Sequence, residues 1–150
     1  VPSTIAKELG LYIVYYSPMQ MAADLPEHYM KHPEAFEFIK KVPVDWDSKV
    51  VLNSSISEYV TIARKDKNSD NWYIGGITDE MERNFNLNLD FLEIGETYDL
   101  LIYKDRKTTH WKVNPMEYDI EKIRLKINES SKLPIFLAPG GGFAVEAIKL

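Results

Sequence analysis

The chain contains no cysteine at any of its 150 positions. Disulfide frameworks, thiolate nucleophiles and cysteine-ligated metal sites are therefore excluded. Clustered positive charge is missing as well, because the formal net charge is −5 and no basic cluster is larger than the pair Lys40 and Lys41. Since proteins hold a phosphate backbone through grouped lysine and arginine side chains, we expect no nucleic-acid partner.

Long apolar segments are also missing. The longest apolar run, residues 9–16, includes Gly10 and is far shorter than the roughly 20 residues of a membrane-spanning helix. We therefore expect no membrane span. The run has the length of a signal-peptide core, but the residues before it are not basic, since Lys7 is followed by Glu8, so we expect no targeting segment in this chain.

The remaining composition is that of a soluble globular protein, with 45% hydrophobic and 27% charged residues. These fractions exclude disordered and collagen-like chains. A chain of this length can bury one hydrophobic core and is too short for two full domains, which predicts one domain with an appendage at most.

The N-terminal residues predict an amphipathic helix that begins after Ser3 or Thr4 and ends before Pro18. From Leu11 onward its apolar residues cover more than one face, so we expect burial on two sides. The cover for the second side is either the rest of a larger protein or a second copy of the chain. A second, short helix is predicted at residues 33–41, which are acidic at their start and basic at their end.

After Trp46 the sequence consists of short β-forming runs separated by turn residues, which is typical of an antiparallel sandwich or barrel. We expect a mainly β fold, a Greek-key-like sandwich of about eight strands preceded by one or two helices. The predicted strands are residues 49–53, 57–65, 71–78, 83–89, 96–104, 121–128, 132–138 and 142–149.

The predicted strand at residues 71–78 contains two consecutive glycines, Gly75 and Gly76. Glycine inside a strand indicates a bulge or the close approach of another backbone or of a ligand. We interpret the pair as a kink that lets a central strand pack in the sandwich, rather than as a ligand site.

Two loops have partial ligand-binding motifs. Residues 66–70 begin like a calcium loop, but position 6 is Asn71 instead of glycine and position 12 is Ile77 instead of glutamate, so we predict a polar hairpin turn. Residues 139–142 are rich in glycine, but the helix of a phosphate-binding loop does not follow them. We predict that they form a hairpin connection between the last two strands.

The histidines do not form a metal motif. His28 and His32 have the i, i+4 spacing of a zinc site, but Pro33 disfavours helical geometry at His32. We expect these two residues and His110 to be unliganded. No metal site is assigned.

No catalytic residue is assigned either, because the acidic residues show no recognisable glycosidase pair and the sequence contains no nucleophile elbow. Four aromatic residues, Trp72, Trp111, Tyr98 and Tyr118, form a candidate platform for sugar rings. We expect them to pack in the core or at its edge, and retain Trp72 and Trp111 as the candidate sugar-binding residues.

Several segments of the chain form a recognisable series. They are residues 17–29 (SPMQMAADLPEHY), 43–47 (PVDWD), 58–60 (EYV) with 63–64 (AR), 72–78 (WYIGGIT) and 137–143 (LAPGGGF). In this order they resemble the C-terminal part of glycoside hydrolase family 97 proteins, and the resemblance spans almost the whole chain.

Members of that family are bacterial exo-acting α-glycosidases, either inverting α-glucosidases or retaining α-galactosidases. They consist of an N-terminal β-sandwich, a central (β/α)8 barrel with a calcium ion at the active site, and a C-terminal β-sandwich. The resemblance implies that residues 1–43 are the last helix and exit segment of a truncated barrel, and that residues 44–150 are the C-terminal sandwich. The family's catalytic and calcium-binding carboxylates lie upstream, so we expect this chain alone to be inactive and to hold no cofactor.

The resemblance also implies the partners of the chain. The sandwich would pack against the remainder of its own barrel, and the intact protein would act on α-linked oligosaccharides in the periplasm or at the cell surface. Two alternatives remain open: a carbohydrate-binding module that uses Trp72 or Trp111, and a homodimeric interaction domain in which residues 9–25 are covered by the second copy.

Overall fold

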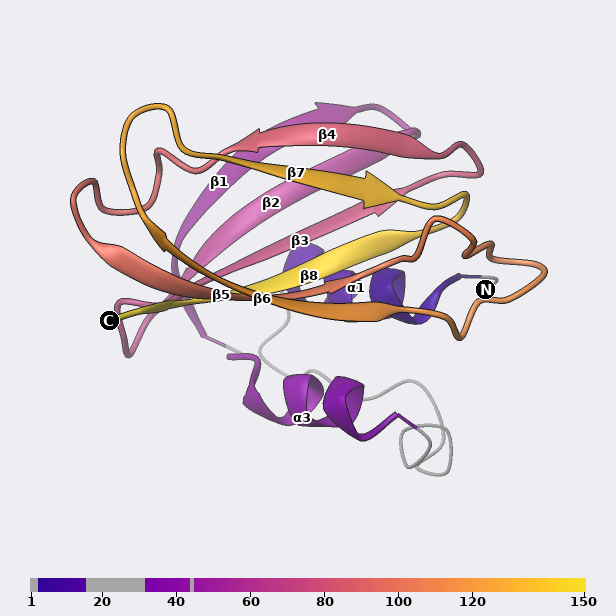
Figure 1. Ribbon diagram of the computed structural model, residues 1–150, viewed down its shortest axis with the longest axis horizontal. Helices are drawn as coiled ribbons and strands as arrows, with labels where there is room; N and C mark the ends of the chain where they lie inside the picture. The colour runs from indigo at the N-terminus through magenta and orange to yellow at the C-terminus, as the bar shows by residue number, and fades with distance from the viewer. Residues whose placement is uncertain (1–2, 16–31, 44) are drawn as a thin grey trace.

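The computed structural model describes residues 3–15, 32–43 and 45–150. In these residues the chain forms three layers, with two helices on one face of a six-stranded sheet and a two-stranded sheet on the other face (Figure 1). The mainly β fold predicted from the sequence is confirmed. The elements are α1 (Ile5–Val14), α3 (Pro33–Lys41), β1 (Trp46–Ser55), β2 (Tyr59–Asp66), β3 (Trp72–Thr78), β4 (Arg83–Asn88), β5 (Thr97–Lys104), β6 (Asp119–Lys126), β7 (Lys132–Leu137) and β8 (Gly142–Lys149).

All eight predicted strands are present, and their bounds differ from the predicted ones by a few residues. The largest difference is in β1, which begins at Trp46 rather than at residue 49. The register between β1 and β2 shifts twice, between Trp46 and Ser48 and between Val51 and Asn53. These shifts let β1 stay paired with β2 over a longer stretch than the alternation of its apolar and polar residues predicts.

The large sheet has the strand order β1-β2-β3-β8-β5-β6, and β4 pairs with β7 in the small sheet. All pairs are antiparallel. The main core lies between the two sheets because alternate residues of each strand point inward. Fully buried residues of this core include Ile74, Leu100, Leu137, Phe143 and Val145.

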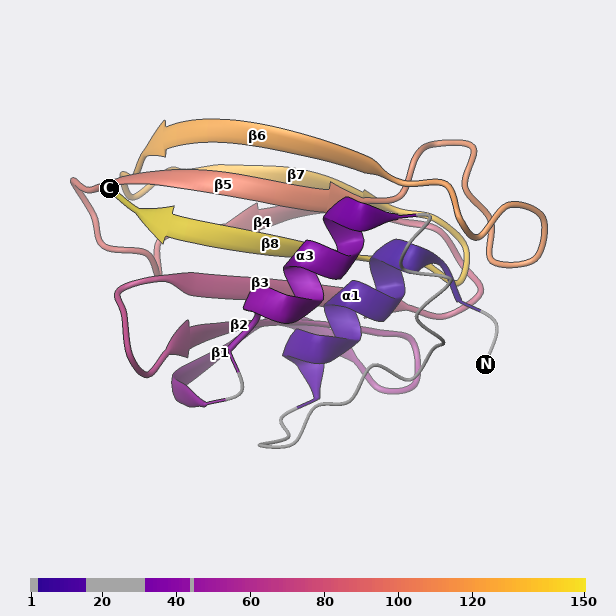
Figure 2. The ribbon, with the colours of Figure 1, turned by 90° about the horizontal axis from the view of Figure 1, so that it is seen from below.

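A second core lies between the large sheet and the helices, which lie side by side across it (Figure 2). Leu9 and Ile13 of α1 and Phe38 of α3 are buried against Tyr73 of β3 and Tyr103 of β5. The helix predicted after Ser3 or Thr4 is confirmed, with Thr4 as its N-cap. Residues 16–31, which contain Pro18, Pro26 and His28, lie outside the described residues.

The glycine-rich segment 138–141 is not the hairpin that we predicted. It follows β7 of the small sheet and leads into β8 of the large sheet, so it crosses between the layers. The sequence shows two consecutive strands but not that they belong to different sheets. The partner of β7 is β4, and the partners of β8 are β3 and β5.

Candidate functional site

The backbone of α1 packs directly against the backbone of the large sheet at three glycines. Gly10 has no side chain because a Cβ there would lie 2.5 Å from the carbonyl oxygen of Phe143 and 2.9 Å from that of Gly76. A Cβ on Gly75 would lie 2.6 Å from the Gly10 carbonyl oxygen and 2.7 Å from Ile13 Cβ. The helix backbone therefore rests directly on the strand backbone.

Positions 75 and 76 are therefore glycine for two different structural reasons. Gly75 faces α1, whereas Gly76 faces the core between the sheets, where the ring of Phe143 occupies the place of a Cβ. The pairing of β3 with both neighbours runs through the two glycines without a register shift, so they do not mark a bulge. The alternative given with it, the approach of another backbone, is what the structure shows.

The C-terminal end of α1 is held by Arg64 of β2. Its guanidinium donates to the carbonyl oxygens of Ile13 at 2.6 Å and of Val14 at 3.1 Å, and the side chain is buried. The last carbonyls of a helix have no partner within the helix, and the negative end of the helix dipole favours a cation there. An arginine from the sheet therefore completes the helix end.

The N-terminal end of α1 is held by polar contacts to the loop between β5 and β6 and to the end of β3. Thr4 is fully buried and accepts from the backbone N–H of Lys7, and the N–H of Ile5 donates to the carbonyl of Pro115. The Lys7 ammonium donates to the carbonyl of Thr78 at 3.1 Å. Beneath this turn, Asp105 accepts from the segment that leads into β8.

Asp105 follows β5 and is 3% exposed. Its Oδ2 accepts from the backbone N–H groups of Ala138 and Gly142, each at 3.0 Å, and it lies where a Cβ on Gly141 would be. Burial raises the pKa of this carboxyl to about 6, although the Thr4 hydroxyl, the two N–H donors and the Lys7 charge favour the ionised form. Burial also lowers the pKa of the Lys7 ammonium, against the attraction of Asp79 and Asp105.

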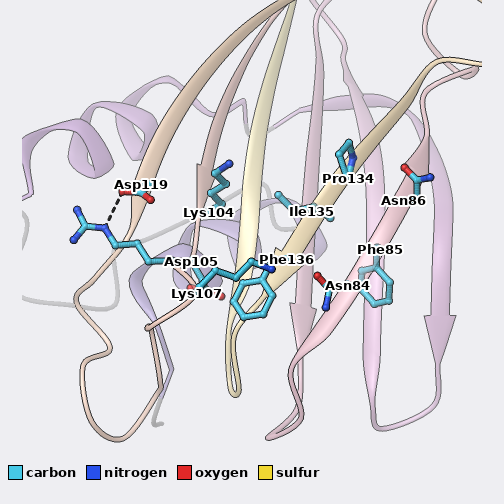
Figure 3. Close-up of a pocket in the computed structure, with 11 residues that line it drawn as sticks. Asn84, Phe85, Asn86, Lys104, Asp105, Lys107, Asp119, Pro134, Ile135 and Phe136 are labelled. Carbon is cyan, nitrogen blue, oxygen red and sulfur yellow. Dashed lines mark hydrogen bonds and ion pairs between the residues drawn. The ribbon is translucent and has the colours of Figure 1, made fainter.

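A pocket of about 470 Å³ lies on the opposite side of the large sheet from α1, between the end of β5 and the small sheet (Figure 3). The Lys107 ammonium lies 4.1 Å from the centre of the Phe136 ring, and Arg106 forms an ion pair with Asp119 at 2.7 Å. The amides of Asn84 and Asn86 also line the pocket. Aromatic, amide and ionic groups together suit a polar ligand with an apolar face, such as a sugar ring.

The four aromatic residues of the proposed platform are not brought together. Trp72 packs edge-on against Phe91 at one end of β3, and Tyr98 is fully buried in the core at that end. Trp111 lies at the other end of β3, roughly 20 Å away for a seven-residue strand, and its side chain covers Gly140. No single surface is formed by Trp72 and Trp111.

The polar motifs rejected from the sequence have structural roles. Asp66 accepts from the N–H of Asn68 and the hydroxyl of Ser69, which closes the turn between β2 and β3. His32 is the residue before α3, and His110 stacks on Trp111. In residues 3–15, 32–43 and 45–150, no three carboxylate or imidazole side chains gather as metal ligands would.

Neither helix that the structure describes has the length and apolarity to cross a bilayer.

The sequence could not reveal the α1 junction as a site. Thr4 was identified as a cap, but Arg64 and Asp105 are about 50 and 100 residues from the helix ends that they serve, and no local pattern links them to it. The glycines Gly10 and Gly75 are the one signal in the sequence, because paired glycines in a helix and in a strand permit two backbones to touch.

The fold and the junction define a β-sandwich with a helix fixed to its larger sheet. Residues 45–148 match the family described as "Glycosyl-hydrolase 97 C-terminal, oligomerisation". The chain belongs to this family, and it is an accessory C-terminal domain of the glycoside hydrolase family 97 type. The resemblance stated from the sequence is confirmed.

Proteins similar to the chain are glycoside hydrolases of greater length. The chain is 37% identical over 143 residues to a retaining α-galactosidase of Bacteroides thetaiotaomicron. This alignment covers 95% of the chain and 20% of that protein. A glycoside hydrolase family 97 enzyme in complex with acarbose, from Pseudoalteromonas sp. strain K8, is 42% identical with a TM-score of 0.94, covering 99% of the chain and 23% of that enzyme. A β-arabinopyranosidase with 24% identity and a TM-score of 0.74, over 96% of the chain and 21% of that protein, shares the fold alone.

The chain therefore spans about a fifth of the length of these relatives. The likeness to the Pseudoalteromonas enzyme includes α1 and α3, whereas the C-terminal family model begins at residue 45. In the matched enzyme the two helices accordingly precede the part that defines the C-terminal family.

Proposed function

We propose that the chain works as the C-terminal domain of an α-glycosidase and that its sandwich fixes the helix that leads out of the catalytic barrel. The observation that carries this proposal is the α1 junction. Arg64 holds one end of the helix, the Thr4 turn holds the other end, and Gly10 rests on the sheet backbone between them. Because α1 is fixed to the sandwich at three points, it would hold the sandwich in one position relative to the barrel.

We also propose, from the family description, that the domain contributes to the assembly of several copies. The whole protein would hydrolyse α-galactosides or α-glucosides. The α-galactosidase relative supports the first substrate class, and the enzyme complexed with acarbose supports a wider range of α-linked sugars. By the family resemblance, residues 1–43 would belong to the barrel and residues 44–150 to the sandwich, the calcium site would lie in the barrel, and the protein would work in the periplasm or at the cell surface.

The role as an accessory domain can be tested with aryl α-galactoside and aryl α-glucoside substrates. We expect the purified 150-residue chain to release no aryl alcohol above the buffer rate, because glycoside cleavage needs two placed carboxylates and, by the family resemblance, these lie upstream of this chain. Turnover that persists through repeated purification would contradict the proposal.

The assembly role needs a separate measurement. Light scattering during gel filtration should give a mass above the 17.4 kDa of one chain at high protein concentration. The contact between copies is formed either by α1 and the residues after it or by the sandwich, and deleting residues 1–25 distinguishes these two surfaces. If the α1 segment forms the contact, the deletion gives monomers. If the sandwich forms it, the assembly remains. A strictly monomeric chain at every concentration would contradict assembly through this domain.

A second candidate function is carbohydrate binding at the pocket of Figure 3. The exposed pair of Asn84 and Asn86 next to the Phe136 ring favours it. Maltooligosaccharide titration, followed by calorimetry and by Trp111 fluorescence, should give a saturable signal that Phe136→Ala removes. A signal that survives this change but is lost in Trp111→Phe would instead assign the binding to Trp111. No saturable signal would contradict the function.

A further inference from the structure

A groove of about 480 Å³ lies along α1, between the helix and the β1–β2 hairpin. It reaches from Lys7 near the start of the helix to Tyr15 directly after its last turn, a span of about 12 Å for eight helical residues. Figure 2 shows β1 and β2 on the side of α1 that faces away from α3. The groove is therefore bounded by α1 and by the edge of the sandwich.

The floor of the groove is a row of side chains from three neighbouring strands. Ser54, Val60 and Ile77 line it, and they are register partners in β1, β2 and β3. Ile77 lies two residues from Gly75, which faces α1, so this row is on the helix side of the large sheet. The floor is mainly apolar.

Three apolar side chains are exposed around this groove. Tyr15 is 65% exposed, Val51 is 51% exposed and Ile56 is 94% exposed. Tyr15 and Ile56 line the groove. Val51 lies on the same side of the sheet as the floor, because its register partner Ile62 is two residues from Val60. Single exposed apolar residues are ordinary, but a group of them around one groove indicates a surface that contacts another protein.

Ile56 is at the tip of the β1–β2 hairpin, in a turn with a defined conformation. The Ser55 hydroxyl donates to the Glu58 carboxylate at 2.8 Å, and the Glu58 N–H donates to the Ser55 carbonyl at 2.9 Å. Ser57 has a φ of 63°, in the left-handed region that few residues other than glycine adopt. Turn positions are usually polar, and a side chain this exposed adds little to the fold of its own chain. The turn therefore presents an isoleucine to whatever lies outside.

The two edges of the large sheet differ in charge. Residues 50–57, at the β1 edge, carry no charged side chain. The other edge, β6, carries five charged side chains in eight residues: Asp119, Glu121, Lys122, Arg124 and Lys126. Charged residues protect an edge against contact with a second chain, because burying them is unfavourable. The two register shifts of β1 disfavour direct strand pairing there, so contact at this edge is made by side chains.

The tip and the groove are placed so that two copies can exchange them. The tip is at the Lys7 end of the groove, because Thr78 accepts from Lys7 and is the register partner of Tyr59, just after the turn. A two-fold interface uses the same surface of both copies. Two grooves that face each other in opposite directions therefore bring the tip of each copy to the partner's Tyr15.

We propose that the tip at Ile56 and the groove along α1 form the contact between two copies of this chain, with Ile56 of each copy in the partner's groove. This inference rests on the assembly role proposed from the family description, and it names the surface that carries that role. Because the insertion is reciprocal, the contact closes at two copies and predicts a dimer.

The dimer is tested by light scattering on the 150-residue chain. The wild type should reach twice the 17.4 kDa of one chain at high protein concentration. Ile56→Asp should raise the dissociation constant by at least about tenfold, because it places a charge in an apolar contact. The matched control is Ile94→Asp, since Ile94 is 52% exposed between β4 and β5 and does not line the groove. Both variants should keep the wild-type midpoint of urea unfolding at concentrations where the chain is monomeric.

Cysteine cross-linking tests where the tip lies. The chain has no cysteine of its own, so chains with one introduced cysteine form disulfides only between copies. An equal mixture of Ile56→Cys and Tyr15→Cys should give a linked dimer that contains one chain of each kind, identified by its mass. A mixture of Ile94→Cys and Tyr15→Cys should give at least tenfold less of the mixed dimer.

The outcomes separate this surface from the assembly role. If folded Ile56→Asp dimerises as tightly as the wild type, the surface is wrong and the assembly role stands. Equal yields of mixed dimer in the two cysteine mixtures would also overturn the surface, and this result decides the question if Ile56→Asp fails to fold. A wild-type chain that is monomeric at every concentration would overturn the surface and the assembly role together.

Discussion

Gly10 of α1 lies on Gly76 of β3 so closely that a Cβ on the helix residue would be 2.9 Å from the strand's carbonyl oxygen. The contact cannot relax by side-chain movement, because the opposing atoms are backbone atoms of the two central strands β3 and β8. The helix can be fixed at this distance only if position 10 has no side chain.

The first prediction follows from this contact. Gly10→Ala should destabilise the chain by about 1–3 kcal/mol, the usual cost of overpacking, even though alanine is the better helix former by about 1 kcal/mol. Urea unfolding followed by circular dichroism measures the change. Lys49→Ala is a suitable control because Lys49 is exposed on the edge strand β1, where a surface substitution usually changes stability by about 0.5 kcal/mol or less. A Gly10→Ala variant more stable than the wild type would contradict the close contact.

The second prediction concerns Arg64, whose buried guanidinium holds the C-terminal carbonyls of α1. Arg64→Ala should cost about 2–4 kcal/mol of unfolding free energy, because hydrogen bonds to charged groups contribute about 1.5–3 kcal/mol and the carbonyls are left without that donor. Arg124→Ala is the matched control, since Arg124 pairs with Asp99 at the surface and such pairs contribute about 0–1 kcal/mol. Equal losses in the two variants would show that Arg64 does not hold the helix.

The third prediction is the pH dependence of global stability through Asp105. Its pKa is raised from 3.8 to about 6 in the folded chain, so between these values the folded state binds more protons than the unfolded state. The stability that this group contributes is therefore present below pH 3.8 and is lost as the pH rises through 6. A difference of about two pKa units corresponds to roughly 3 kcal/mol.

Urea unfolding at pH 5 and at pH 7.5 should show about half of this loss, roughly 1.4 kcal/mol, because the other half falls below pH 5. Asp105→Asn should remove most of the difference between the two pH values, and at pH 7.5 it should be at least as stable as the wild type. Asp105→Ala should be less stable than Asp105→Asn at both values, since it leaves the N–H groups of Ala138 and Gly142 without their acceptor. If the stability of the wild type rises from pH 5 to pH 7.5 while that of Asp105→Asn does not, the assigned direction is wrong.

The sequence predicts the β part of this fold well because each strand carries its own alternation and turn residues. It also predicts α1 and its Thr4 cap, since both depend on neighbours within one helical turn. Which strands are neighbours depends on contacts between distant residues, so the hairpin predicted at residues 139–142 was wrong: β7 and β8 belong to different sheets.

The same limit applies to the candidate site. Arg64 and Asp105 resemble any charged residue beside a strand until the fold places them against the ends of α1. Glycine at positions 10, 75 and 76 indicates a close approach but does not identify the group that approaches. For Gly75 that group is α1, which lies more than 60 residues away in the sequence.

The fourth prediction concerns the tyrosines beneath and beside α3. Burial, assisted by the carboxylate of Glu146, raises the pKa of Tyr103 to about 12 and that of Tyr73, which donates to Glu146 at 3.2 Å, further still. Burial and the nearby Glu34 raise the pKa of Tyr118 to about 12. Because the folded pKa values exceed the unfolded value near 10, the stability from these groups is present below pH 10 and is lost as the pH rises through 12.

Absorbance at 295 nm should therefore show these three of the nine tyrosines still protonated at pH 11, where circular dichroism still reports the folded chain. Glu146→Gln should lower the pKa of Tyr73 and Tyr103 and leave that of Tyr118 unchanged, because only the first two depend on that carboxylate. Ionisation of all tyrosines in one step near pH 10 by the folded chain would mean that α3 does not cover Tyr73 and Tyr103. The second core between the helices and the large sheet would then be open to solvent.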